Sequence, residues 1–142
     1  AVQLFEGQAQ PSLIAADAVL VASGTATLET LLVRRPMVAA YRFSALTAFL
    51  LRRLGLVNVR YFSQPNLLTG QPLVPEFLQE AVNGPALGQA LLGQLTDTAG
   101  RARVDAEFLK VHERLRVGAA DRAAQAILEL LEQRGIRRAV AP

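Results

Sequence analysis

The 142-residue sequence contains no cysteine, so disulfide bonds and thiolate metal sites are excluded within it. Apolar residues make up 51% of the chain, which is typical of a folded domain and not of a disordered one. The net charge is +3 and there is a single histidine, His112, which argues against a histidine-based metal centre or a catalytic triad.

Short apolar runs and helix-spaced apolar residues alternate along the first 80 residues. No apolar run approaches the roughly 20 residues of a membrane helix, and no secretory leader pattern begins at Ala1. The predicted elements, in order, are a strand over 2–5, a helix over 11–16, a strand over 18–22, a helix over 25–33, a strand over 37–41, a helix over 44–55 and a strand over 57–61.

The second half of the chain is predicted to be mostly helical. Turn-forming residues predict a loop over 63–72, and Pro75 is predicted to open a short helix that carries Glu76 and Gln79. Helices are predicted over 85–95, 97–116 and 119–134, followed by a loose basic tail. Alternating strands and helices predict an α/β fold, with a Rossmann-like parallel sheet and helices on both faces, followed by carboxyl-terminal helices.

We expect three regions. Residues 1–95 form a Rossmann-like domain. Residues 96–134 form helices that pack on that domain, on a further domain or on a second subunit, and residues 135–142 form a flexible tail.

The turn from the strand over 18–22 into the next helix is the first candidate site. Ser23, Gly24 and Thr25 form a small polar loop, so backbone N–H groups and the positive end of the helix dipole point beyond the strand. Phosphate suits such a place. Thr25 and Glu29 share one helix face and can hold sugar hydroxyls. The alternative is an ordinary helix cap with a glycine turn.

Two further candidates follow neighbouring predicted strands. Arg42 comes after the strand over 37–41, and Asn66 lies in the loop after the strand over 57–61. Ligands of parallel sheets sit beyond the carboxyl ends of the strands, where both residues would meet the Ser23 turn. An amide can read a sugar or a base, although an Asx-type turn is the alternative for Asn66.

The interval between Glu29 and Glu76 contains no acidic residue but six arginines. Arginine binds phosphate oxygens well, so this interval predicts an anionic partner such as a nucleotide, a lipid phosphate or a membrane surface. The helix over 44–55 is basic and amphipathic, and Arg52 and Arg53 are its candidate membrane or anion contacts. A helix packed on the sheet with two exposed arginines is the alternative. Nucleic acid is not predicted, because aromatic stacking residues are lacking near the arginines.

An ordered set of motifs resembles the carboxyl-terminal part of the bacterial lipid-A-disaccharide synthase family, from about Ala15 to Leu131. The motifs are Ala-Ser-Gly-Thr-Ala-Thr-Leu-Glu at 22–29, Arg-Pro-Met-Val at 35–38, Tyr-Arg at 41–42, Leu-Thr at 46–47, Pro-Asn-Leu-Leu at 65–68, Val-Pro-Glu-Phe-Leu-Gln at 74–79, Phe108 with His112, Leu-Arg at 115–116 and Arg-Ala-Ala-Gln-Ala at 122–126. Gln64 departs from the pattern, which favours an apolar residue there.

The resemblance implies one half of an inverting glycosyltransferase with two Rossmann domains. Residues 1–95 would then be its nucleotide-sugar-binding domain, incomplete at its amino end. The family joins UDP-2,3-diacylglucosamine to lipid X, giving lipid A disaccharide 1-phosphate and UDP, without a metal or other cofactor. By position, Ser23, Gly24 and Thr25 would line the diphosphate and Glu29 would contact the ribose. Arg42 and Asn66 would reach the phosphates, the uracil or the sugar, with their roles undivided.

The resemblance also implies that the general base and the acceptor site lie in an amino-terminal domain that this chain lacks, so the fragment alone is expected to be inactive. The full enzyme would be cytoplasmic and peripheral on the cytoplasmic face of the inner membrane, and a homodimer is one expectation. The alternative function is a non-catalytic α/β module that binds anionic lipid or a membrane surface through the arginine-rich interval.

Overall fold

The computed structural model describes residues 2–44, 47, 49, 50, 53, 60–116 and 118–134. The chain divides into two compact units, Ala1–His112 and Glu113–Pro142.

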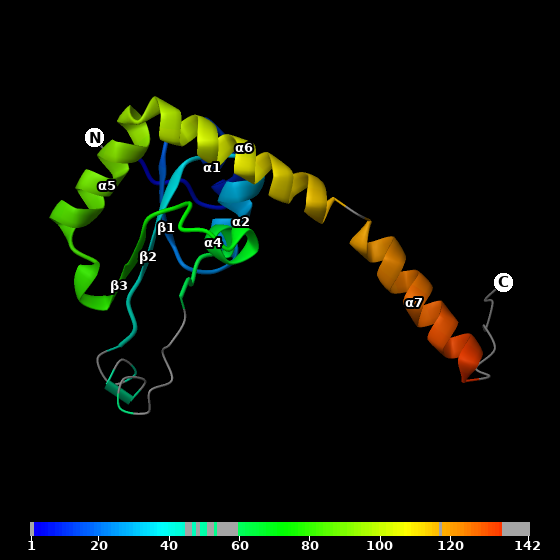
Figure 1. Ribbon diagram of the computed structural model, residues 1–142. Helices are drawn as coiled ribbons and strands as arrows, with labels where there is room; N and C mark the ends of the chain where they lie inside the picture. The colour runs from blue at the N-terminus through cyan, green and yellow to red at the C-terminus, as the bar shows by residue number, and fades with distance from the viewer. Residues whose placement is uncertain are drawn as a thin grey trace. The chain divides into compact units, whose positions relative to one another are not determined.

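The first unit contains a three-stranded parallel sheet (Figure 1). The strands are β1 (Val19–Ala22), β2 (Met37–Tyr41) and β3 (Glu76–Leu78), in the order β1-β2-β3. Val19 pairs with Met37, and Ala39 pairs with Glu76. Because all three strands run in one direction, their carboxyl ends share one edge of the sheet. The predicted α/β class with a parallel sheet is confirmed.

Helices cover the sheet on both faces. The first unit contains α1 (Ala9–Ala15), α2 (Thr25–Leu32), α4 (Gln64–Thr69), the 3₁₀ turn η1 (Gln79–Ala81) and α5 (Gly84–Thr96), and α6 (Thr98–Leu115) begins in it. In Figure 1, α2 and α4 lie side by side on one face, and α5 packs against β1 and β2 on the other. The helices predicted over 85–95 and 97–116 are confirmed as α5 and α6.

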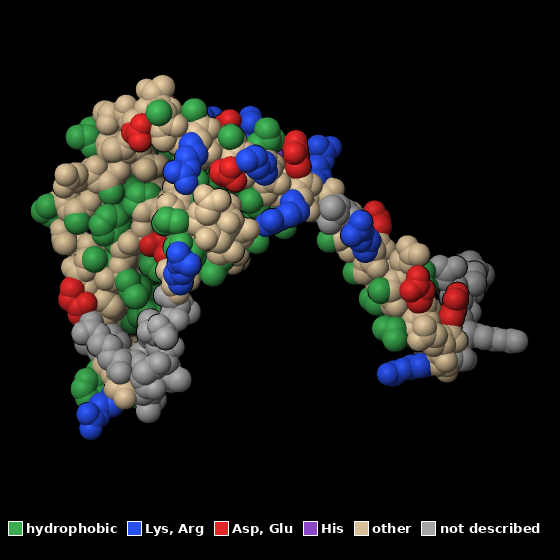
Figure 2. Space-filling model, viewed as in Figure 1, with side chains coloured by type: hydrophobic (Ala, Val, Ile, Leu, Met, Phe, Trp, Pro, Cys, Tyr) green, Lys and Arg blue, Asp and Glu red, His purple; other side chains and the backbone are tan. Residues whose placement is uncertain are grey.

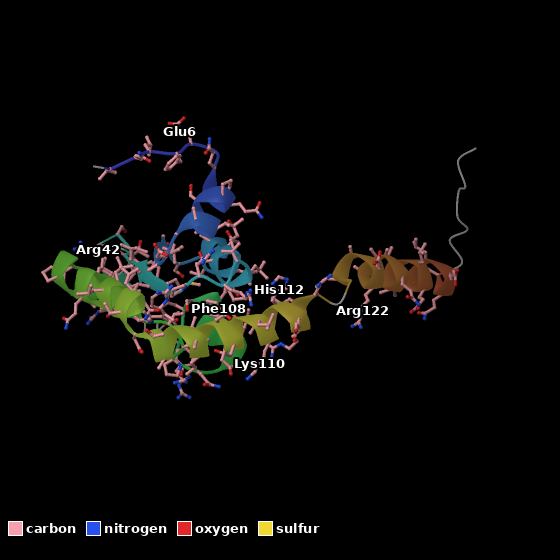
Figure 3. All side chains as sticks on the ribbon, turned by 90° about the horizontal axis from the view of Figure 1, so that it is seen from above. Glu6, Arg42, Phe108, Lys110, His112 and Arg122 are labelled. Carbon is pink, nitrogen blue, oxygen red and sulfur yellow. The ribbon has the colours of Figure 1, made fainter. Side chains whose placement is uncertain are left out.

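The core of the first unit lies between the sheet and α6. Phe108 is fully buried, and Val104 and Val111 lie one turn to either side of it on the same helix face. These side chains join a cluster that includes Leu31 of α2 and Met37 of β2. In Figure 3 Phe108 points to the sheet side of α6 and Lys110 to its outer side, which matches the apolar periodicity of this helix.

The second unit contains α7 (Ala119–Gln133), which begins after Gly118 in the left-handed conformation with φ 63°. None of its residues is buried, and Ile127 and Leu130 are exposed. The helix predicted over 119–134 is confirmed. Among the helices that the structure describes, none is long and apolar enough to cross a membrane.

Two predictions around β3 were wrong. The predicted loop over 63–72 contains α4, since Ser63 is the N-cap residue, Pro65 sits in the first turn and Gly70 ends the helix with φ 67°. The short helix predicted from Pro75 is instead β3 followed by η1. The carbonyl oxygen of Pro75 accepts a hydrogen bond from Ala39 N at 2.9 Å, so pairing with β2 decides the local structure.

The strand predicted over residues 2–5 was also wrong, because Val2–Phe5 form no strand and the sheet pairs none of them. Strands predicted over 18–22 and 37–41 are confirmed, as are the helices over 11–16 and 25–33 to within two residues. The helix predicted over 44–55 lies mostly outside the described residues, although Thr47, Phe49, Leu50 and Arg53 are helical. Residues 57–59 of a predicted strand and the tail from Gly135 also lie outside them.

Candidate functional site

The turn between β1 and α2 lies at the carboxyl edge of the sheet. Ser23 N donates to Ala40 O at 3.1 Å, so the pairing of β1 with β2 continues to the first residue of the turn. Gly24 follows with φ 142° and ψ −158°, a backbone conformation that essentially only glycine adopts. Gly24 and Thr25 are exposed. The strand end and the glycine together turn the chain sharply into α2.

The first turn of α2 presents free donors at this edge. Gly24 supplies no side-chain cap, and no side chain in the described part of the molecule accepts from the N–H groups of Gly24, Thr25 or Ala26. Thr27 N donates to Gly24 O at 3.1 Å. Unpaired N–H groups and the helix dipole attract an anion, so the turn has the geometry of a phosphate site.

The end of β2 lies beside this turn. Arg42 follows β2 directly and is exposed. The next backbone N–H, that of Phe43, donates to Gln79 Oε1 at 2.5 Å, which ties the end of β2 to the end of β3. The Phe43 ring also meets the Tyr41 ring edge to face, with centroids 4.8 Å apart. The structure therefore brings Ser23, Gly24, Thr25 and Arg42 to one edge of the sheet, as the sequence predicted.

Glu29 lies one helical turn beyond Thr25 on α2. Its side chain is exposed and lines a hollow of 270 Å³ with Gln10 and Leu13 of α1. Among the described residues, its carboxylate has no hydrogen-bond or ion-pair partner. A hydroxyl-bearing ligand on this face of α2 would therefore find an available acceptor.

Asn66 lies in α4 and not in a loop, and only 1% of it is exposed. Its Oδ1 accepts from Leu73 N at 2.8 Å and from Val74 N at 2.9 Å. Its Nδ2 donates to Val74 O and to Glu76 Oε1, both at 2.9 Å. These four bonds use the full capacity of the amide donors and both lone pairs of its oxygen. Asn66 is therefore a buried structural residue, and its amide fixes the chain that enters β3.

A hydrogen-bond network that the sequence analysis missed supports the Ser23 turn. Segment 62–66 contacts the turn on one side and the Glu76 carboxylate on the other. Ser23 Oγ donates to Phe62 O at 3.1 Å, and Gln64 N donates to Thr27 Oγ1 at 3.2 Å. Glu76 could have been singled out as the first acidic residue after Glu29, since a carboxylate next to a buried strand needs donors.

A larger hollow of 650 Å³ opens beside β3. In Figure 2 this hollow lies below α6 and beside α5, and apolar side chains form its floor. Arg60, Arg101 and Arg103 line it, and in the described part of the chain none of them pairs with a carboxylate. Two carboxylates, those of Glu76 and Asp97, also line it. Glu76 Oε1 accepts from Ser63 N, and Asp97 Oδ1 accepts from Gly100 N, both at 2.9 Å. No sequence pattern predicts that Arg101 and Arg103 lie beside Arg60.

The two candidate membrane contacts are only partly placed. Arg53 is helical and exposed, whereas Arg52 lies outside the described residues.

Comparison with known proteins identifies the family. The model of the lipid-A-disaccharide synthetase family matches residues 1–130. Lipid-A-disaccharide synthase of Alkalilimnicola ehrlichii is 52% identical over 128 residues, which are 90% of this chain and 33% of that protein. The synthases of Xylella fastidiosa strain M23 and Pseudoalteromonas translucida are each 44% identical over 92% of the chain, which covers 34% and 33% of their lengths. The chain spans about a third of the length of these curated relatives. It belongs to the lipid-A-disaccharide synthetase family.

Proposed function

We propose that this chain is the nucleotide-sugar-binding part of an inverting glycosyltransferase of lipid A biosynthesis. The reaction joins UDP-2,3-diacylglucosamine to lipid X and releases UDP and lipid A disaccharide 1-phosphate. Family membership supports the reaction, and the relatives are named for it. We place the general base and the acceptor site outside these 142 residues, so that the chain alone is inactive in transfer.

The free N–H groups of Gly24, Thr25 and Ala26 carry this proposal. They lie at the carboxyl edge of a parallel sheet, where a diphosphate gains both hydrogen bonds and the helix dipole. In the proposed complex Ser23, Gly24 and Thr25 line the diphosphate, and Glu29 accepts hydrogen bonds from the ribose. Arg42 neutralises phosphate charge as UDP leaves, in place of a metal ion.

We assign Asn66 an indirect part in donor binding. Its amide is fully used within the protein, so it acts by holding the chain that frames the site. This refines the expectation that Asn66 touches the donor.

A UDP titration followed by amide chemical shifts tests the nucleotide site. Saturable shifts are expected at Ser23–Glu29, and Glu29→Ala should weaken binding about tenfold, since one charge-assisted hydrogen bond to the ribose is lost. Glu107→Ala is the matched control, because that carboxylate pairs with Lys110 on α6 at 2.7 Å, away from the turn. The absence of UDP shifts in the protein at its natural length would refute the proposal.

We further propose that the protein is peripheral on the cytoplasmic face of the inner membrane, where both lipid substrates reside, and that it acts as a homodimer. Arg52 and Arg53 are the proposed membrane contacts. Size-exclusion chromatography with light scattering tests the dimer, and a monomer at all micromolar concentrations would exclude it.

The 650 Å³ hollow favours a second candidate function, the binding of an anionic lipid by this α/β module. Arg60, Arg101 and Arg103 supply guanidinium groups above an apolar floor that includes Leu73. A lipid phosphate with an acyl chain complements that lining.

Vesicle flotation separates this function from surface contact through the amphipathic helix. Phosphatidylglycerol vesicles should retain less of the Arg101→Ala/Arg103→Ala variant if the hollow binds lipid. They should retain less of Arg52→Ala/Arg53→Ala if the helix makes the contact. Binding of the wild-type protein that is no greater than to phosphatidylcholine vesicles would exclude both.

A further inference from the structure

Glu76 collects four hydrogen bonds from one short segment of the chain. Its Oε2 accepts from Phe62 N at 3.1 Å. Its Oε1 accepts from Ser63 N at 2.9 Å, from Ser63 Oγ at 2.5 Å and from Asn66 Nδ2 at 2.9 Å. Hydrogen bonds to an ionised carboxylate are stronger than neutral ones. The first residue of β3 therefore fixes segment 62–66 in both position and orientation.

The other side of segment 62–66 holds the β1–α2 turn. Ser23 Oγ donates to Phe62 O at 3.1 Å, and Gln64 N donates to Thr27 Oγ1 at 3.2 Å. Thr27 Oγ1 in turn donates to Gly24 O at 2.8 Å. The side-by-side placement of α2 and α4 brings these groups together (Figure 1).

The inner links of this network are shielded from water, whereas Ser23, Phe62, Gln64 and Glu76 are half-buried. Thr27 and Ser63 are fully buried, and Asn66 is nearly so. Water cannot readily replace a lost partner there, so a change at one link is passed to the next and is not absorbed by solvent. Two short paths lead from Glu76 to the turn. One runs through Phe62 to Ser23, and the other runs through Ser63 and the adjacent Gln64 to Thr27 and then Gly24.

We propose that Glu76 is a positioning residue for the nucleotide site. Through segment 62–66 its carboxylate sets the orientation of the Ser23–Thr25 turn, and thus of the N–H groups that bind the diphosphate. The inference rests on the proposed UDP site, because it explains how that site is held ready in the absence of ligand. Glu76 is not among the residues proposed to contact UDP.

The test compares Glu76→Gln with Val111→Ala in the protein at its natural length. Glutamine keeps the shape of the side chain but replaces one accepting oxygen with an NH₂ group, so either Phe62 N or the Ser63 donors lose their acceptor. Val111 is 3% exposed and lies in the core outside the network, so its truncation lowers stability without touching the turn. UDP binding is measured by calorimetry at a temperature where both variants are folded.

Glu76→Gln should raise the Kd for UDP about tenfold, the loss expected for one hydrogen bond to a charged group. Val111→Ala should leave the Kd for UDP unchanged, even if it lowers the midpoint of thermal unfolding by as much as Glu76→Gln does. Equal effects of the two variants on the Kd would reduce Glu76 to a stabilising residue and overturn the inference.

A ligand-free measurement separates this inference from the proposed function. In the absence of UDP, Glu76→Gln should move the amide resonances of Ser23–Thr27, whereas Val111→Ala should not. If wild-type protein fails to bind UDP but these resonances still move, the nucleotide site is refuted and the coupling stands. If UDP binds and the resonances stay in place, the coupling is refuted and the nucleotide site stands.

A second variant approaches the same network from the turn. Thr27→Val keeps the shape of a fully buried side chain but removes the acceptor of Gln64 N. It should move the amide resonance of Gln64 and raise the Kd for UDP. The double variant with Glu76→Gln should raise the Kd for UDP by less than the two single effects combined. Both changes interrupt the same path, which runs through Gln64 and Thr27 to Gly24. Strict additivity would contradict a shared path, and this variant decides the question should Glu76→Gln fail to fold.

Discussion

Gly24 occupies a backbone conformation that carries a cost for any other residue. Its φ of 142° with ψ of −158° lies in a region that is essentially restricted to glycine. A Cβ built on Gly24 would meet no atom within 4 Å, so the penalty comes from backbone strain and not from a clash. This single residue sets the angle at which β1 leads into α2.

Gly24→Ala should therefore lower the free energy of unfolding by about 1–3 kcal/mol. Gly88→Ala is the matched control, since Gly88 lies inside α5, has an equally open Cβ position and has no positive φ. That change should stabilise the protein by about 0.5–1 kcal/mol. Urea denaturation followed by circular dichroism measures both, and the same sign for the two variants would show that strain at Gly24 is not the cause.

Asn66 serves the fold through each of its side-chain polar atoms. Asn66→Ala should lower the free energy of unfolding by about 2–5 kcal/mol, because buried N–H groups of Leu73 and Val74 lose their acceptor. Asn83→Ala, which removes an exposed helix cap that accepts from Ala86 N, should cost only about 1 kcal/mol. Equal losses in thermal or urea unfolding would show that burial does not set the cost.

At the scale of the elements, the apolar pattern was a sufficient guide where a segment has its own periodicity. β1, α2, β2, α5, α6 and α7 were all predicted, since each carries either an apolar run or a helix-spaced apolar face. The candidate residues at the ends of β1 and β2 could be placed together for the same reason, because parallel strands align their carboxyl ends.

Prediction failed where contacts far apart in the sequence decide the structure. Ser63, Pro65 and Gly70 have the composition of a loop, yet in α4 they act as the start and stop of a helix. Glu76 has no strand propensity, but pairing of its strand with β2 extends the chain there. The role of Asn66 could not be foreseen either, because its four partners are set by the packing of α4 against the chain entering β3.

Helix α6 stabilises the first unit mainly through the side chain of Phe108, which is fully buried. Phe108→Ala should lower the free energy of unfolding by about 3–5 kcal/mol, since it empties a fully buried site among Leu31, Met37 and Val104. Lys110→Ala lies on the outer side of the same helix, where 69% of the lysine side chain is exposed, and should change stability by less than about 0.5 kcal/mol. Guanidinium titration of both variants checks the contrast, and a similar loss for each would place the stabilising face of α6 elsewhere.

At the scale of the whole molecule, all residues of the buried hydrophobic cluster belong to the first unit. Its members run from Val21 to Val111, all within Ala1–His112, whereas α7 buries none of its residues. A chain that ends at Arg116 should therefore keep the midpoint of thermal unfolding of the 142-residue chain to within about 2 °C, because its core is intact. Differential scanning calorimetry of the two chains decides this, and a markedly lower midpoint would assign α7 a share in the stability of the first unit.

Two hydrogen bonds hold the ends of the sequence between Phe43 and Phe62, which makes this sequence a candidate position for insertions. Phe43 N is held by Gln79, and Phe62 N is held by Glu76, so side chains only three positions apart anchor both ends of the intervening sequence. We expect an epitope or reporter peptide inserted between Phe43 and Phe62 to leave the register of the sheet unchanged, because these hydrogen bonds hold the two ends of the sequence.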